Sequence, residues 1–164
     1  KLIIILDFEK IVSDINPDTG LKVSEVEALG VRERNDIPIL IAEDSALLNA
    51  LICDSLKKAG YCNIISCENG KEAWNVIQDC KAKDILDEHV KLVITDIEMP
   101  QMDGHHLLKL IREDSATEDI PVIIFSSLIN DEMRRKGEAL GANVQLTKPE
   151  IGNLVREIDA LVLS

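Results

Sequence analysis

Apolar runs alternate with helix-like patterns along the chain from residue 37 onward. Five short runs are apolar at nearly every position, which is typical of strands in a parallel sheet that helices cover on both faces. Each run is followed by a segment whose apolar residues recur at the spacing of an amphipathic helix. The predicted strands are residues 37–42, 62–67, 91–96, 120–127 and 143–148, and the predicted helices are residues 45–60, 70–81, 103–114, 131–141 and 150–163. Five right-handed strand-helix units predict an α/β domain with a doubly wound, five-stranded parallel sheet.

The first 36 residues do not share this regular pattern. Residues 2–6 predict a strand, residues 7–15 have apolar positions at helical spacing, and NPDTG at 16–20 breaks the pattern. The charged stretch that follows has no clear strand and is compatible with a linker helix. We therefore divide the chain into the remnant of a preceding domain at 1–19, a linker at 20–36 and the regular domain at 37–164.

Composition and charge restrict the functions of the chain. Among its 164 residues, 46% are hydrophobic, and no apolar run approaches the eighteen or more residues of a membrane span. A net charge of −12 argues against a protein that lies along nucleic acid or an anionic membrane. The four cysteines form no metal-binding pattern, so we interpret them as small core residues in a reducing, cytoplasmic compartment. No signal peptide is recognisable, and the start on Lys1 rather than Met suggests an excised fragment.

Acidic residues follow two of the predicted strands directly. Glu43 and Asp44 come after the first strand, and Asp96 comes after the third. With the strand order 2-1-3-4-5, strands 1 and 3 flank the point where the order reverses, and ligands bind outside the carboxyl ends of strands at such a point. Three carboxylates in one crevice repel one another by a few kcal/mol per close pair, even at an effective dielectric constant of about 20. A divalent cation removes this conflict, and ligation by oxygen alone favours Mg²⁺ over Zn²⁺.

Two further polar residues are expected at the same edge of the sheet. Ser126 lies at the end of the fourth strand and offers a hydroxyl group, although Ser127 beside it could share that role. Lys148 ends the fifth strand and offers a fixed positive charge. A phosphoryl group carries roughly 1.5 to 2 negative charges, which suits Mg²⁺, a hydroxyl and an ammonium group together. Asp96 is then the natural nucleophile, because a carboxylate can attack phosphorus to form an aspartyl phosphate.

Together these motifs resemble a response-regulator receiver domain of the CheY type over residues 37–164. The motifs are the pair Glu43 and Asp44, DIEMP with Asp96, MDG at 102–104, Ser126, and GANVQLTKP at 141–149. The resemblance implies the (βα)₅ flavodoxin-like receiver fold and phosphoryl transfer from a histidine kinase to Asp96. It implies that Asp44, Asp96 and the backbone carbonyl of Glu98 ligate Mg²⁺, with Glu43 acting through a bound water. It also implies a cis peptide bond between Lys148 and Pro149.

The beginning of the chain carries a second resemblance. Residues 1–19 are similar to the last strand and helix of a CheW-type coupling domain, and a coupling domain followed by a receiver is the arrangement of CheV-type chemotaxis proteins. This resemblance implies a CheA-like kinase as one partner and chemoreceptors, through the coupling domain, as another. Phosphorylation would then switch the conformation of the receiver and modulate receptor-kinase coupling, without enzymatic turnover of a separate substrate.

Several features of the sequence leave alternatives open. Position 145 holds Gln where many receivers have an aromatic switch residue, so we expect the output to depend less on that side chain. A receiver that is not phosphorylated and acts only as a scaffold is one alternative. A haloacid-dehalogenase-like phosphatase is a weaker one, suggested by Glu98 two residues after Asp96. His105 and His106 are interpreted as solvated residues in the first turn of a helix.

Overall fold

The computed structural model describes residues 33–127, 129–148 and 151–163. Five parallel strands form one sheet in the order β2-β1-β3-β4-β5, as the sequence predicted. The strands are β1 (Ile39–Ala42), β2 (Ile64–Cys67), β3 (Leu92–Thr95), β4 (Val122–Ser126) and β5 (Val144–Thr147). The helices are α3 (Ala46–Lys58), α4 (Gly70–Ala82), α5 (Leu86–His89), α6 (Gly104–Glu113), α7 (Asp131–Leu140) and α8 (Ile151–Val162). The elements predicted within residues 1–19 and nearly all of the linker lie outside the described residues.

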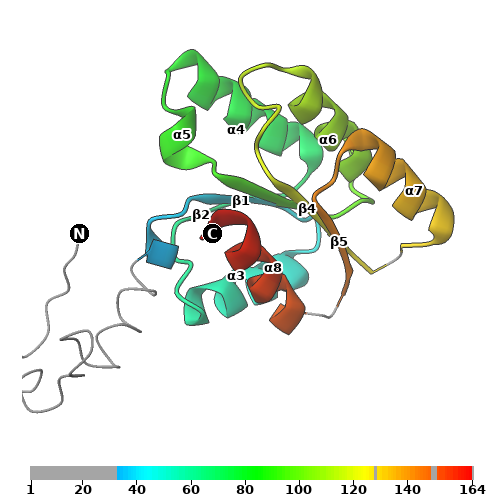
Figure 1. Cartoon of the computed structure of the whole chain (residues 1–164), viewed down its shortest axis with the longest axis horizontal. Helices are drawn as coiled ribbons and strands as arrows, with labels where there is room; N and C mark the ends of the chain where they lie inside the picture. Colours follow the sequence, from blue (N-terminus) through cyan, green and yellow to red (C-terminus); the bar gives the residue numbers. More distant parts are fainter. Residues whose placement is uncertain (1–32, 128, 149–150, 164) are drawn as a thin grey trace, which may run out of the picture.

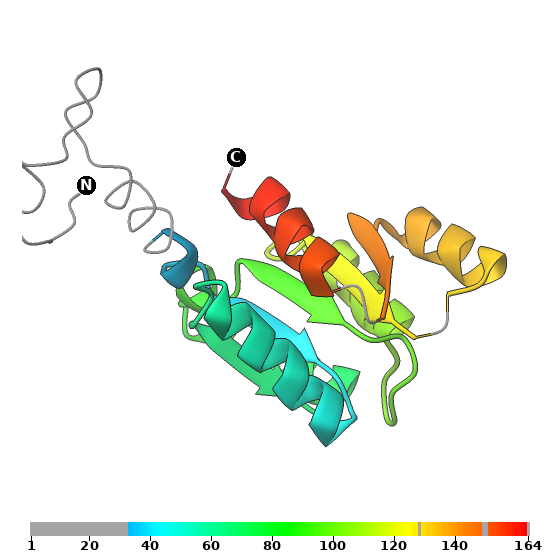
Figure 2. The same cartoon turned by 90° about the horizontal axis from the view of Figure 1, so that it is seen from below.

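Helices cover both faces of the sheet (Figure 1). Helices α4, α6 and α7 lie on one face, and α3 and α8 lie on the other; in Figure 2, which is seen from below, α3 and α8 lie in front of the sheet. Alternate residues of β1 enter different cores: Leu40 packs toward α4 and α6, whereas Ile39 and Ile41 pack toward α3 and α8. β1 and β3 are therefore buried at every position, which explains their uninterrupted apolar sequences.

Capping residues mark the start of α3 and the end of α7, as the sequence predicts. The Ser45 side chain accepts a hydrogen bond from the backbone N–H of Leu48 at the start of α3, as expected for an N-cap. At the end of α7, Gly141 has φ of 93°, the left-handed conformation that glycine adopts without a steric penalty. Ser45 thus fixes where α3 begins after β1, and Gly141 fixes where α7 ends before β5.

Two details of the fold differ from the expectations. Residues 82–90 carry no predicted element, but the structure has a separate short helix there, α5, which follows α4 after a turn in which Asp84 adopts φ of 57°. The cysteines are not all core residues: Cys67 and Cys80 are buried, whereas Cys53 is half-buried and Cys62 is exposed. All four are free thiols.

The end of the linker is attached to the sheet domain through a half-buried ion pair. Arg34 donates hydrogen bonds to both carboxylate oxygens of Asp159 on α8, at 3.2 and 2.6 Å. The hydroxyl of the fully buried Tyr61 donates to the same carboxylate at 2.5 Å. Burial and the nearby Asp159 carboxylate raise the pKa of Tyr61, so the phenol stays protonated. Every helix in the described part of the chain is too short or too polar to span a lipid bilayer.

Candidate functional site

The carboxyl ends of β1 and β3 bring three carboxylates together. Ala42 pairs with Thr95 in the sheet, and the backbone N–H of Asp96 donates to the carbonyl of Ala42 at 3.0 Å. The residues that follow these strands are therefore neighbours. Glu43, Asp44 and Asp96 each offer one carboxylate oxygen, and these three oxygens lie within 4.8 Å of one another. The convergence predicted from the sequence is confirmed, while the roles of these residues remain predictions.

Lys148 supplies the positive charge of this cluster. It follows β5, and its Nζ atom donates hydrogen bonds to Glu43 Oε1 and to Asp96 Oδ2, the second at 3.2 Å. The three side chains are 8%, 2% and 11% exposed respectively, so water screens their charges weakly. An ammonium group between two carboxylates offsets part of the repulsion that the sequence led us to expect.

Hydrogen bonds hold the two interacting carboxylates in fixed directions. Glu43 Oε2 accepts from the backbone N–H of Ser45 at 3.0 Å, and Asp96 Oδ1 accepts from the backbone N–H of Ile97 at 2.7 Å. Burial raises the pKa of Glu43, and the Asp96 charge adds to this rise, while the Lys148 ammonium and the Ser45 N–H oppose it. Asp44, by contrast, is exposed at the mouth of the cluster.

Ser126 and Glu98 lie at the same edge of the sheet. Ser126 is the last residue of β4 and is 2% exposed, and its carbonyl accepts from the backbone N–H of Lys148 at 2.9 Å. Ser127 next to it is exposed. Glu98 has an exposed side chain in the loop after β3. The ligand role predicted for its carbonyl stays a prediction, and the predicted cis peptide involves Pro149, which lies outside the described residues.

A close backbone approach requires glycine at position 104. A Cβ atom there would lie 1.9 Å from the carbonyl oxygen of Asp96, and the Gly104 N–H donates to the Ile97 carbonyl at 2.8 Å. The MDG motif therefore has a steric function: it allows the start of α6 to lie against the loop that carries Asp96. Asp103 caps this helix, because its side chain accepts from the N–H of His106 at 2.7 Å.

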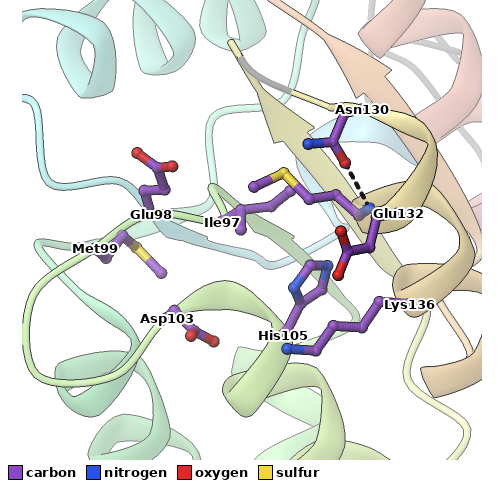
Figure 3. A pocket seen from close by; sticks show the side chains of 9 residues that line it. Ile97, Glu98, Met99, Asp103, His105, Asn130, Glu132 and Lys136 are labelled. Atoms are coloured by element: carbon purple, nitrogen blue, oxygen red, sulfur yellow. Dashed lines mark hydrogen bonds between the residues drawn. The ribbon is translucent and has the colours of Figure 1, made fainter.

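The interpretation of His105 as a solvated residue is wrong. His105 is 4% exposed and lines a cavity of about 500 Å³ between the loop after β3 and the start of α7, whereas His106 is exposed as expected. Figure 3 shows its imidazole between α6 and the α7 residues Glu132 and Lys136. Burial and the Lys136 charge lower the pKa of His105, against an opposing effect of Asp103 and the Met133 backbone. His105 is buried because α7 packs over the first turn of α6.

Gln145 fills the position where many receivers have an aromatic residue. Its side-chain amide donates to the carbonyl of Arg134 on α7 at 2.9 Å. A Cβ atom at Gly137 would lie 2.3 Å from the Gln145 amide oxygen, so the amide packs directly against α7. This side chain thus attaches α7 to β5.

Sequence reasoning missed one polar residue next to the cluster. Asn49 on α3 is 8% exposed and donates hydrogen bonds to the carbonyls of Glu43 and Cys67, at 3.1 and 3.3 Å. The sequence does carry a signal for Asn49: its helical spacing from Ile52 and Leu56 places it with them on the core-facing side of α3.

Comparisons with known proteins agree with this geometry. The family model of the response regulator receiver domain matches residues 39–159. The chain is 29% identical over 164 residues to the chemotaxis protein CheV3 of Helicobacter pylori, which covers 99% of this chain and 51% of that protein. It is 33% identical over 156 residues to the chemotaxis protein CheV2 of the same organism, with coverage of 92% and 47%. The chain thus spans about half the length of these curated relatives.

A solved structure supports the fold independently. The chemotaxis protein CheY4 of Vibrio cholerae superposes with a TM-score of 0.66 at 24% identity, over 76% of this chain and 98% of that one. At this identity the similarity concerns the fold alone, and it agrees with the five-stranded order observed here.

Proposed function

The chain belongs to the response regulator receiver domain family, and from this premise we propose that Asp96 accepts a phosphoryl group in two-component chemotaxis signalling. One observation carries the proposal: Lys148 contacts the carboxylates of both Glu43 and Asp96 at the edge of the sheet where Asp44 completes the acidic cluster. Five residues from four separate stretches of sequence lie at this edge, with Ser126 at the end of β4. A role as a helix cap or in a turn would require only one of these residues and would not explain why they lie together.

The residues at this edge suit a hard divalent cation. The acidic cluster offers only oxygen atoms, which Mg²⁺ prefers, and contains no histidine or thiolate ligand. We propose that Asp44, Asp96 and the backbone carbonyl of Glu98 hold Mg²⁺ and that Glu43 acts through a bound water. Bound Mg²⁺ neutralises negative charge on the phosphoryl oxygens during transfer.

Three side chains then have separate roles in phosphoryl transfer. One Asp96 oxygen attacks the phosphorus of a phosphohistidine, and the new O–P bond forms as the N–P bond breaks, with its electron pair remaining on the imidazole nitrogen. The Lys148 ammonium moves from the carboxylates to the transferred group, which carries roughly 1.5 to 2 negative charges. The Ser126 hydroxyl donates a hydrogen bond to a phosphoryl oxygen. Phosphorylation thereby favours one of two conformations of the domain, and slow hydrolysis of the aspartyl phosphate reverses the change.

The similarity to the two CheV proteins supports a proposal for the wider role of the chain. We propose that residues 1–19 are the end of a CheW-like coupling domain and that residues 20–36 link it to the receiver at 37–164. In that arrangement a CheA-like histidine kinase supplies the phosphoryl group in the cytoplasm. Chemoreceptors contact the coupling domain, and phosphorylation changes how receptors and kinase are coupled. The chain acts as a switch rather than as an enzyme with its own substrate.

The experiment is phosphorylation of the full chain with acetyl phosphate and Mg²⁺, followed by intact mass measurement. We expect a single acid-labile phosphate that is absent from Asp96→Asn and absent when EDTA removes the metal. The matched control is Asp103→Asn, an exposed helix cap close in sequence, which should still be modified. If the wild-type chain gains no phosphate while remaining folded, the domain is an unphosphorylated scaffold. Multiple turnover of a phosphomonoester would instead indicate a phosphatase.

A further inference from the structure

The side-chain amide of Asn49 is buried, and all four of its hydrogen-bonding positions are filled. Its Nδ2 atom donates to the carbonyl oxygens of Glu43 and Cys67, at 3.1 and 3.3 Å. Its Oδ1 atom accepts from the Ser66 hydroxyl and, at 3.4 Å, from the Cys53 thiol. A primary amide has two donor hydrogens and two acceptor lone pairs, so no further partner can be added.

This network admits only one orientation of the amide. The two groups near Nδ2 are carbonyls, which can only accept, whereas the hydroxyl and thiol near Oδ1 can donate. Exchange of the oxygen and nitrogen atoms would place an oxygen against two carbonyl oxygens. Glu43 follows β1 and Cys67 ends β2, so Asn49 on α3 joins the carboxyl ends of two neighbouring strands. The Glu43 N–H also donates to the Cys67 carbonyl at 3.0 Å, which ties the two chain segments a second time.

The consequence for Asp44 comes from its two flanking peptide groups. The peptide before Asp44 is held through the Glu43 carbonyl by Asn49. The peptide after it is held through the Ser45 N–H, which donates to Glu43 Oε2 at 3.0 Å. Because each peptide group is planar, fixing both of them sets the backbone dihedral angles of Asp44 and hence the direction of its Cα–Cβ bond. The exposed Asp44 carboxylate is therefore aimed into the acidic cluster by the backbone.

We propose that Asn49 is a positioning residue for the metal site: it acts through the Glu43 carbonyl to hold Asp44 where it can ligate Mg²⁺. This inference rests on the proposed function, because it concerns the same site. Partners behind metal ligands typically contribute about 10- to 100-fold in metal affinity. Asn49 does not contact the reacting atoms, so its effect should appear in Mg²⁺ binding.

The test is isothermal titration of the full chain with Mg²⁺. Asn49→Leu keeps the branching of the side chain at Cγ and removes both donated hydrogen bonds, and we expect it to weaken Mg²⁺ binding about 10-fold or more. Asn49→Ala provides the same comparison if leucine does not pack. Cys53→Ala removes one bond to Oδ1 and leaves the bond to the Glu43 carbonyl, so its Mg²⁺ affinity should stay within about twofold of wild type.

The variant Ile52→Ala distinguishes a specific effect of Asn49 on the metal site from a general loss of stability. Ile52 lies on the same helix at 3% exposure and contacts the core, so this variant lowers the urea midpoint without touching the Glu43 carbonyl. Weak Mg²⁺ binding in the Asn49 variants together with unchanged binding in Ile52→Ala supports the positioning role. Equal weakening in both, or wild-type affinity in Asn49→Leu, overturns it. A wild-type chain that binds no Mg²⁺ overturns the proposed function, and the positioning role with it.

Discussion

Replacement of Lys148 by methionine should expose the repulsion within the acidic cluster. Methionine keeps an unbranched stem of similar length but removes the ammonium group. At 3.2 Å from Asp96 Oδ2, a unit positive charge contributes about 5 kcal/mol of attraction at an effective dielectric constant of about 20. Desolvation of the ammonium offsets part of this, and removal of one partner from a buried ion pair typically costs about 3–5 kcal/mol. We therefore expect Lys148→Met to lower the free energy of unfolding by about 3 kcal/mol in EDTA.

The assay is urea unfolding followed by circular dichroism, with Lys58→Met as the matched control. Lys58 pairs with Asp54 one helical turn away, at side-chain exposures of 77% and 60%, so its loss should cost less than about 1 kcal/mol. Saturating Mg²⁺ should restore part of the Lys148→Met loss, since a ligand present at about 100 times its dissociation constant stabilises by about 2.7 kcal/mol. If Lys148→Met in EDTA costs no more than Lys58→Met, the ion pair does not offset the acidic repulsion, and our electrostatic reasoning is refuted.

Three further substitutions test individual parts of the structure. Gly104→Ala should lower the free energy of unfolding by more than about 2 kcal/mol in urea titrations, because its Cβ would lie 1.9 Å from a carbonyl oxygen. Gly152→Ala on α8 is the control: its Cβ would meet no atom within 4 Å, so it should stabilise the protein by up to about 1 kcal/mol. His105→Leu should gain stability relative to wild type as pH falls from about 7 to 5, by at most about 1.4 kcal/mol per pH unit. The lowered pKa of His105 means that the wild-type unfolded state binds more protons in this range, so parallel pH–stability curves would contradict this reasoning. Gln145→Ala should leave acetyl phosphate labelling and most signalling intact, and a variant that is phosphorylated normally but does not signal would disprove that expectation.

The strand order and the position of the acidic cluster could be predicted because both depend on local patterns. Uninterrupted apolar runs identify buried parallel strands, and the order 2-1-3-4-5 places the ends of β1 and β3 side by side. Element boundaries were less accurate. The first strand begins at Ile39 rather than Ile37, after Pro38, which has no backbone N–H to donate to a neighbouring strand.

The remaining features depend on contacts between distant segments. His105 looked polar and exposed in sequence, but its burial results from packing of α7, which lies 26 residues further along at Asp131. The break between α4 and α5 occurs at Asp84, an aspartate with φ of 57° where no glycine marks the turn. The choice of Glu43 and Asp96 as partners of Lys148 requires side-chain directions that only the folded chain fixes.

The most direct test of the proposed phosphoacceptor site is a crystal structure of the chain with Mg²⁺ and beryllofluoride, which mimics a phosphoryl group. We expect beryllium bonded to an Asp96 oxygen and Mg²⁺ at about 2.0–2.1 Å from the Asp44 and Asp96 carboxylates and the Glu98 carbonyl. Lys148 and Ser126 should contact the fluorine atoms. Beryllofluoride bound away from Asp96, or Mg²⁺ held without Asp44, would contradict the site as we describe it.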